Sequence, residues 1–368
     1  MYNQFILDLP EDIMILFLLF IIMTAFVGLK AAKPGEFFDD YMTRENTTAV
    51  NGLFVLLIFL SHAEGYIQAS GALDNAYLTF KNNMLQLVVV SFLFYSGYGI
   101  MESIKHKGQA YVRSIPAKRF FKVYYRMVIC VCLFIVLNLI LRQNYGLKRT
   151  LLAFTGWTGI GNSNWYIFVI LVLYLFVFLS FSVFRKHLWP GVILTTVLSA
   201  ALVLVQIKLG RKGWTYNTVM LFPTGMIFSL AKEPFEKIVK RNDSFWFLSV
   251  GAVAAGFTVL HYLEPKNIVT YSLWAIFFMM LLVLLTMKIQ LKNPILSHFG
   301  SHVFSVYMLQ RIPMIFLSYI GFNEKNKYAF VAVSFAATVI LSYFFEMITE
   351  KTDALLFKKA KTDNRTSA

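Results

Sequence analysis

The chain has 368 residues, of which 58% are hydrophobic, 17% aromatic and only 14% charged, and its formal net charge is +15. A soluble domain carries about 25% charged residues, so this composition leaves too little polar surface for a water-soluble protein. It excludes the soluble, fibrous and disordered classes and indicates a polytopic membrane protein.

Eleven apolar runs are long enough to cross a bilayer core of about 30 Å as helices. They predict an all-α polytopic bundle of ten or eleven transmembrane helices, forming one membrane domain over 1–347 with a short basic tail over 348–368. The first run follows an acidic segment and is not a cleavable signal peptide. The runs lie near 13–29, 48–65, 84–101, 121–141, 164–184, 190–207, 214–231, 244–263, 268–287, 299–320 and 328–347.

The distribution of basic residues predicts the orientation of these spans. If the N-terminus lies outside, the inner connections and the tail carry 23 Lys and Arg residues and the outer connections carry 10. Positive residues favour the cytosolic side, so we expect an outside N-terminus and a cytosolic C-terminus in a multi-pass cell-membrane protein. The net charge is then mainly a signal of topology, and nucleic acid is not an expected partner.

His62 is the most informative polar residue, because it closes the second apolar run. Asn51 lies eleven residues earlier, so the two share one helical face about 16 Å apart along the axis. An imidazole with a pKa near neutrality is suited to accept a proton from a hydroxyl. The alternative is a histidine that hydrogen-bonds between helices for packing. Glu64 faces away from His62 and is a weak candidate partner.

The third run and the basic stretch after it supply candidate ligands for a donor substrate. Ser96 stands with Gly97 and Gly99 at the end of the run, in a pattern that suits either close helix packing or a slot for an acyl chain. The 22 residues from 105 to 126 contain seven Lys and Arg. These residues either set the topology or hold phosphate groups. Three of them are spaced i, i+3, i+7 and so share one helical face, which makes them the better phosphate candidates: Arg119, Lys122 and Arg126.

Two later segments carry further polar and aromatic candidates. Trp165 and Tyr166 follow a glycine-rich outer loop, where they act as a membrane-interface belt or as a platform for a sugar. In the tenth run, Arg311 falls near mid-membrane and needs a partner or water, and Tyr307 and Gln310 precede it. Glu346, near the inner end of the last run, is a candidate partner for a basic residue. Cys130 and Cys132 share one apolar run, and no cluster has metal-ligand spacing, so no metal site is expected.

Several segments, in order, resemble the integral-membrane acyltransferase family 3. NTTAVNGLFVLLIFLSHAEGY is similar to the family's first helix ending in His, and FLFYSGYGI followed by PAKRFFKVYYR is similar to its Ser-Gly-aromatic helix end and basic stretch. NWYIFVILVLY resembles its Trp-Tyr helix start, and GSHVFSVYMLQ its late Tyr-Leu helix.

The resemblance implies a ten-helix core that moves an acyl group, often acetyl, from cytosolic acyl-CoA to a hydroxyl of an envelope glycan. It assigns His62 as the catalytic base and Arg119 as the conserved Arg of the basic stretch. Asn51 stands where many members have Arg, and Gln310 stands where many have His. The first change removes a charge proposed to help hold the donor, and the second weakens any mechanism that uses two histidines. The N-terminal span is an addition to the family pattern.

We therefore expect a membrane O-acyltransferase that acetylates a cell-surface polysaccharide or lipid-linked glycan. Acyl-CoA is the expected donor substrate, no cofactor is permanently bound, and the expected partners are membrane lipids, acyl-CoA and the glycan acceptor. Asn51, Ser96 and the basic series are assigned to the donor, and Trp165, Tyr166 and the tenth run to the acceptor or its polar network. The alternative is a transporter or flippase for a sugar or lipid intermediate, although no internal repeat supports it.

Overall fold

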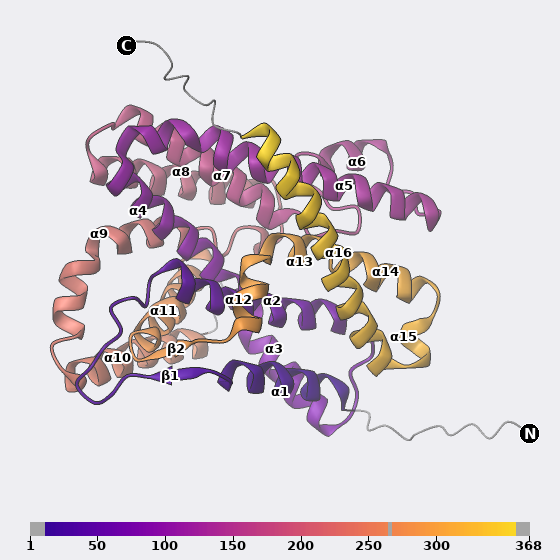
Figure 1. The fold of residues 1–368 in the computed structure, drawn as a ribbon, viewed down its shortest axis with the longest axis horizontal. Coiled ribbons are helices and arrows are strands. Elements are labelled where there is room, and N and C mark those ends of the chain that lie inside the picture. The colour runs from indigo at the N-terminus through magenta and orange to yellow at the C-terminus, as the bar shows by residue number, and fades with distance from the viewer. Residues whose placement is uncertain (1–11, 264–266, 358–368) are drawn as a thin grey trace, which may run out of the picture.

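A computed structural model describes residues 12–263 and 267–357 of the chain. The described part is almost entirely helical, with one short pair of strands (Figure 1). Its elements are α1 (Ile13–Phe26), β1 (Leu29–Ala31), α2 (Arg44–Glu64), α3 (Ala72–Met84), α4 (Val90–Ile115), α5 (Lys122–Ile140), α6 (Leu147–Ala153), α7 (Trp165–Val183), α8 (Leu188–Lys208), α9 (Leu221–Val239), α10 (Asp243–Tyr262), α11 (Ile268–Thr286), β2 (Ile289–Leu291), α12 (Pro294–Ser301), α13 (Val303–Leu309), α14 (Arg311–Tyr319), α15 (Phe322–Lys325) and α16 (Lys327–Leu356).

The all-α membrane bundle expected from the sequence is confirmed. Seven helical segments within the described residues are long and apolar enough to cross a membrane. One of them, Gln86–Ile140, contains two of the predicted spans, which are joined through a kink at Gly108. Two further apolar segments, α1 and Val303–Tyr319, are shorter, and the 14 residues of α1 rise only about 21 Å. The number of crossings, ten or eleven, stays a prediction.

The basic stretch over 105–126 is helical along most of its length. The chain is helical from α4 through a π-helical turn at Pro116–Phe121 into α5. It changes direction at Gly108, whose φ of 54° and ψ of −141° lie outside the helical region. Glycine tolerates this conformation because it has no Cβ, so the direction changes with little interruption of helix.

Two predicted spans have different bounds in the structure. The helix expected at 214–231 starts only at Leu221 and extends to Val239, after a short 3₁₀ turn at Gly213–Thr215. The span expected at 299–320 is divided into α12, α13 and α14, with breaks at His302 and Gln310. Pro313 explains the second break, because it has no N–H to donate to the Leu309 carbonyl and its ring crowds that position.

The N-terminal helix is tied to the rest of the molecule at both ends. At its start, the Asp74 carboxylate accepts from the Met14 amide at 2.8 Å, while Asp12 accepts from the Asp74 amide at 2.9 Å. At its end, β1 pairs antiparallel with β2, and Asn293 donates to the Thr24 carbonyl at 2.8 Å. The sequence analysis did not predict α3 or the strand pair, because both are short and lack an apolar run. Helix α16 also takes up the first residues of the predicted tail, and 358–368 lie outside the described residues.

Glycines set the closest helix crossings in the core. A Cβ at Gly52 of α2 would overlap the carbonyl of Leu296 in α12, and one at Gly300 would overlap the Thr48 carbonyl in return. The same relation joins α4 to α9, where Gly97 lies against the Phe222 carbonyl. Small residues allow this close approach of backbones in membrane proteins. Gly97 therefore serves packing, which was one of the two expected roles of this segment.

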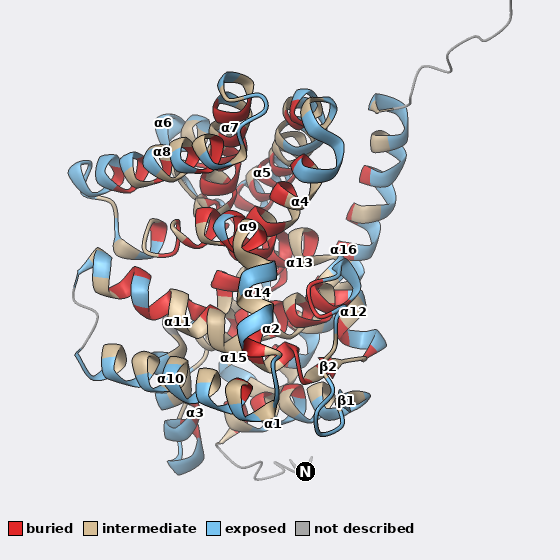
Figure 2. Ribbon diagram, turned by 90° about the vertical axis from the view of Figure 1, so that its left-hand side faces the viewer, coloured by how far each residue is buried: buried red, intermediate tan, exposed pale blue. Residues whose placement is uncertain are grey.

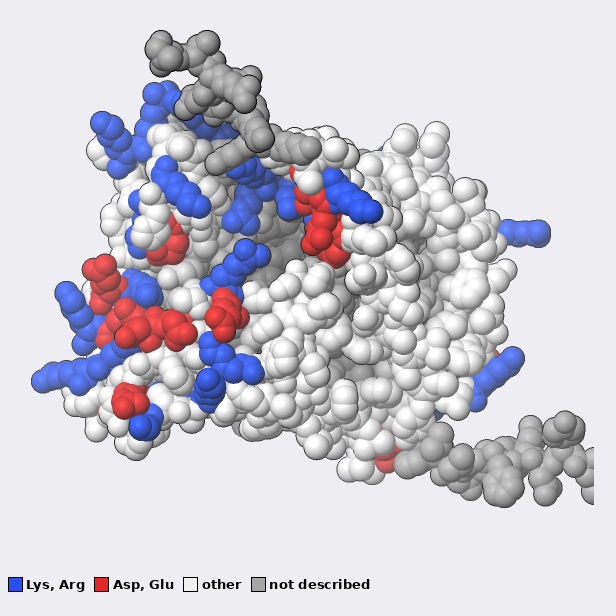
Figure 3. All heavy atoms as spheres, viewed as in Figure 1, with Lys and Arg blue, Asp and Glu red and all other residues white. Residues whose placement is uncertain are grey.

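Burial and charge divide the molecule into distinct regions. Buried residues gather where α2, α4, α9 and α13 meet, whereas α10 buries only Trp246 (Figure 2). Charged side chains gather on one side of the view in Figure 3, around β1, β2 and the start of α10, and the opposite side is almost free of them. Ion pairs populate this charged side, including Lys288–Asp243 at 2.5 Å and Lys292–Glu45 at 3.0 Å.

Gly52 lies against the backbone of α12, whereas Gly99 faces open space, and this difference gives a matched test of the α2–α12 crossing. We expect Gly52→Ala to lower the thermal stability of the detergent-purified protein, since its methyl group meets the backbone of α12. Gly99→Ala is the control, because nothing lies within 4 Å of a Cβ there. Replacing a helical glycine by alanine otherwise gains about 0.5–1 kcal/mol. A Gly52→Ala protein at least as stable as the control variant would contradict the tight crossing.

Candidate functional site

A cavity of about 770 Å³ has His62 in its wall. Five separate segments form this wall: the end of α2, residues 86–89 before α4, the connection from α5 to α7, the connection from α8 to α9, and the α13–α14 break. All but the last belong to loops or helix ends that the basic-residue count assigns to the outer side. The lining residues are Ile58, Ser61, His62, Gln86, Val88, Val89, Tyr145, Arg149, Trp157, Thr158, Gly159, Gly161, Asn162, Ser163, Asn164, Trp165, Gly210, Arg211, Lys212, Trp214, Thr215, Tyr307 and Arg311.

His62 sits in the last turn of α2, at the wall of the cavity. Its Nδ1 is buried and has no hydrogen-bond partner among the described residues. The ring packs against Tyr307, with 6.2 Å between ring centroids. Asn51 lies on the same helix but does not line the cavity, and its side-chain oxygen accepts from Ser91 at 3.0 Å. The imidazole alone of these two expected residues therefore faces the cavity.

The tenth predicted span contributes to the wall at the point where its helix breaks. Arg311 begins α14 and lines both the main cavity and a neighbouring one of about 330 Å³. Its Nε is buried and has no hydrogen-bond partner among the described residues, and the ion pairs of the described residues do not include Arg311. Gln310 is fully buried away from the cavity and donates to the Tyr307 carbonyl at 3.1 Å.

The aromatic pair after the glycine-rich loop is divided between two positions. Trp165 lines the cavity, while Tyr166 lies behind Tyr307, with 6.0 Å between their ring centroids. Buried asparagines fix the loop itself. Asn164 donates to the carbonyls of Ala153 and Thr158, at 3.1 and 3.0 Å. This loop is therefore an ordered wall of the cavity.

Sequence reasoning missed three cationic residues of the cavity. Arg149 comes from the connection between α5 and α7, Arg211 and Lys212 come from the connection between α8 and α9, and all three line the same space as Arg311. They had been counted only as part of the topological signal. Burial lowers the pKa of the Arg211 guanidinium from its ordinary value, although arginine stays charged at any physiological pH. Their position on the side where basic residues are scarce was the available signal.

Ser96 and Arg119 lie away from the cavity and are linked through Tyr174. The Ser96 hydroxyl is 3.3 Å from the Tyr174 hydroxyl, which also interacts with the Arg119 guanidinium. Arg119 Nε donates in addition to the Tyr111 hydroxyl at 3.1 Å. The guanidinium contacts no carboxylate among the described residues, so its charge is available to an anion.

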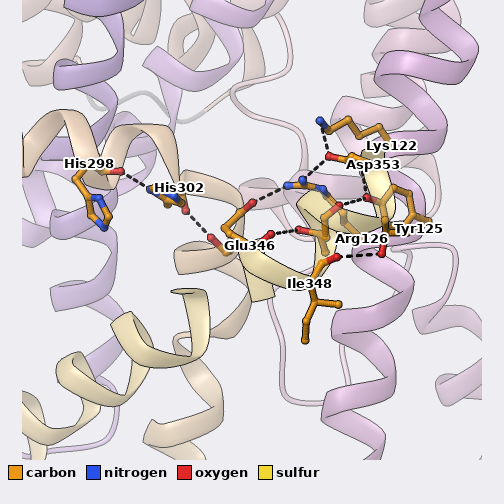
Figure 4. Close-up of polar contacts among 11 residues, drawn as sticks. Lys122, Tyr125, Arg126, His298, His302, Glu346, Ile348 and Asp353 are labelled. Carbon is orange, nitrogen blue, oxygen red and sulfur yellow. Dashed lines mark hydrogen bonds and ion pairs between the residues drawn. The ribbon is translucent and has the colours of Figure 1, made fainter. Parts of the chain in front are cut away.

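Lys122 and Arg126 are instead paired with carboxylates of α16 (Figure 4). Arg126 reaches Glu346 at 3.0 Å and Asp353 at 2.7 Å, and Lys122 reaches the same oxygen of Asp353 at 2.7 Å. The expected pairing of Glu346 with a basic residue is confirmed. Glu64, by contrast, pairs with Lys81 and not with His62.

A second cavity of about 450 Å³ lies between α12–α13 and α16, next to this ion-pair cluster. Its lining includes His298, His302, Glu346 and Glu350. The His302 Nδ1 lies 2.8 Å from the His298 carbonyl, so that interaction belongs to the local turn of the helix.

Comparison with known proteins agrees with this geometry. A family model described as an acyltransferase domain, that of acyltransferase family 3, matches residues 49–347, which include every cavity-lining segment. No curated protein and no solved structure shows significant similarity to the chain. Because the family model covers most of the chain, the chain belongs to acyltransferase family 3, a membrane-associated family of acyltransferases.

Proposed function

We propose that the protein transfers an acyl group, in the first instance acetyl, from cytosolic acyl-CoA to a hydroxyl of a cell-surface polysaccharide or lipid-linked glycan. The main support is His62, which lines a polar, aromatic-walled cavity large enough for sugar units and whose buried Nδ1 has no hydrogen-bond partner among the described residues. Membership of an acyltransferase family supports the reaction class.

His62 is the general base in this proposal. The acceptor hydroxyl gives its proton to the imidazole as its oxygen attacks the thioester carbonyl. The carbon–sulfur bond then breaks, the coenzyme A sulfur leaves with the electron pair, and the proton on the imidazole passes to that sulfur. The histidine therefore ends the cycle neutral, and no outside oxidant, reductant or metal is needed to balance the step.

The donor approaches from the opposite side of the membrane domain. Arg119 is the first phosphate ligand, because its guanidinium is not held by a carboxylate among the described residues. Lys122 and Arg126 contribute to phosphate binding only if the phosphate displaces the carboxylates of Asp353 and Glu346 from them. Ser96 and Asn51 mark the path of the acyl arm, and Asn51 is separated from His62 by about 16 Å of α2.

Acceptor binding falls to the cavity. Trp165 and Tyr307 supply aromatic surface for sugar rings, with Tyr166 supporting Tyr307 from behind. Arg311 is next to them at the break between α13 and α14. The buried Gln310 holds this break through the Tyr307 carbonyl and does not contact the acceptor.

Substitution of His62 separates a chemical role from a packing role. We expect His62→Ala and His62→Gln both to lose acyl transfer by at least about 10²–10⁴-fold, because a glutamine cannot accept the proton. A packing histidine would tolerate glutamine, since an interhelical hydrogen bond in membranes contributes only about 1–2 kcal/mol. Transfer of labelled acetyl from acetyl-CoA to an envelope extract is the measurement. Near-normal transfer by His62→Gln refutes the base, and continued substrate movement without transfer would favour a transporter.

The donor site is tested at the basic end of α5. We expect the double variant Arg119→Ala, Lys122→Ala to bind acetyl-CoA more weakly, because each charge-assisted hydrogen bond contributes about 1.5–3 kcal/mol. Lys118→Ala is the control, as it removes an exposed neighbouring charge. Binding is measured by equilibrium dialysis with labelled acetyl-CoA. Unchanged affinity in the double variant would leave this cluster with a topological role alone.

The orientation is tested with single cysteines in exposed connections. In a background without Cys130 and Cys132, Lys325→Cys should react with a membrane-impermeant maleimide in intact cells. Lys186→Cys should react only after the membrane is opened. Both positions are exposed in the structure, so a difference in labelling reports the side of the membrane. The reverse pattern would overturn the proposed outside N-terminus.

A further inference from the structure

Four cationic side chains converge on the cavity that holds His62. Arg149 comes from α6, Arg211 and Lys212 from the connection between α8 and α9, and Arg311 from the start of α14. None of the described residues that line the cavity is an Asp or Glu. Positive residues are disfavoured in outer connections, so their gathering around one space there calls for a ligand rather than a topological explanation.

Aromatic rings, not carboxylates, position three of these cations. The Arg211 guanidinium lies 4.4 Å from the centroid of the Trp157 ring, and the Lys212 ammonium lies 4.8 Å from that of Trp214. Arg149 lies over Tyr145 at 4.7 Å. All three rings line the cavity as well. A cation held over a ring face keeps its charge unneutralised. Arg149 also donates from Nε to the Gly159 carbonyl at 2.8 Å, which fixes its guanidinium at the cavity wall.

Two arginines of the cavity each have a side-chain N–H group without a hydrogen-bond partner among the described residues. Arg211 Nε and Arg311 Nε are both buried without a hydrogen-bond partner among the described residues. A buried charged donor without a partner is costly, and an anion is the group that relieves this cost most fully. Arginine also offers the planar pair of donors that fits a carboxylate or phosphate.

We propose that the acceptor is an acidic glycan, whose carboxylate or phosphate group is bound by these cationic side chains while a neighbouring hydroxyl is presented to His62. This inference rests on the proposed function for the role of the hydroxyl, but the preference for an anion does not depend on it. The aromatic rings bind the sugar faces, and the cations select acidic over neutral sugars.

Binding of three oligosaccharides to the purified full-length protein tests the preference directly. The probes are chitotetraose, which is neutral, a hyaluronan tetrasaccharide, in which alternate sugars carry a carboxylate, and chitotetraose phosphorylated at its reducing end. Binding is followed by tryptophan fluorescence, because Trp157, Trp165 and Trp214 line the cavity. We expect at least one acidic probe to bind ten times more tightly than chitotetraose, and this advantage to shrink as salt is added.

Matched variants locate the preference in the cavity. Arg211→Gln should reduce the advantage of the acidic probe about tenfold and leave chitotetraose binding unchanged. Lys208→Gln is its control, since Lys208 is a basic residue of the same region that does not line the cavity. If Arg211→Gln fails to fold, Lys212→Gln is used for the same binding comparison, with the same expected loss. Equal binding of all three probes, or equal losses in Arg211→Gln and Lys208→Gln, would overturn the proposal.

Coenzyme A separates this site from the donor site. If Arg211→Gln weakens acetyl-CoA binding and leaves the acidic probe unaffected, the cavity holds the donor phosphates and the proposal fails. Because the experiment measures binding, its result does not depend on whether the protein transfers an acyl group. A protein that binds acidic sugars selectively yet transfers no acetyl group would retain this inference and lose the proposed function.

Discussion

In a hydrocarbon core, each backbone N–H and C=O needs a partner within the protein, so broken helix is tolerated only where protein or a water-filled space surrounds it. This constraint organises the site. The segment expected to cross at 299–320 lacks the backbone hydrogen bond from position 313 to Leu309, because Pro313 has no N–H, and the neighbouring residues Tyr307 and Arg311 line the cavity that holds His62. The ordered loop up to Asn164 forms another wall of the same space, and buried asparagine side chains satisfy several of its carbonyls.

The basic residues show two ways of carrying charge in such a molecule. Arg126 is paired with two carboxylates of α16, so its charge holds helices together. Arg211 rests on Trp157 and has no carboxylate partner among the residues described. A paired cation contributes to architecture and is a poor ligand, whereas a stacked one is positioned for a ligand and costs stability until the ligand arrives. Contacts of this kind separate structural from functional charges better than position along the chain does.

The class of fold could be predicted from the sequence, and so could several polar residues that are unusual inside membrane spans. Hydropathy and length located the apolar helices, and the expectation that polar residues inside spans are functional led to His62, Tyr307 and Arg311. The ends of the helices could not be predicted as well. Gly108 and Pro313 act through local backbone geometry, to which a hydropathy pattern is insensitive. The convergence of Arg149 with Arg211 was not predictable, since it depends on how two outer connections separated by α7 and α8 fold over one space.

The attachment of α1 has a consequence for what counts as the minimal unit of this protein. The family match starts at residue 49, after α1, so the N-terminal helix lies outside the matched region. Yet Asp12 satisfies the first amides of α3, which lies inside the matched region, and Asn293 joins the last carbonyls of α1 to the first amides of α12. A chain shortened to the shared region would therefore leave orphan donors within the shared region itself. The N-terminal helix therefore supplies hydrogen-bond partners to the matched region in two places, the first amides of α3 and the Asn293 side chain that caps α12.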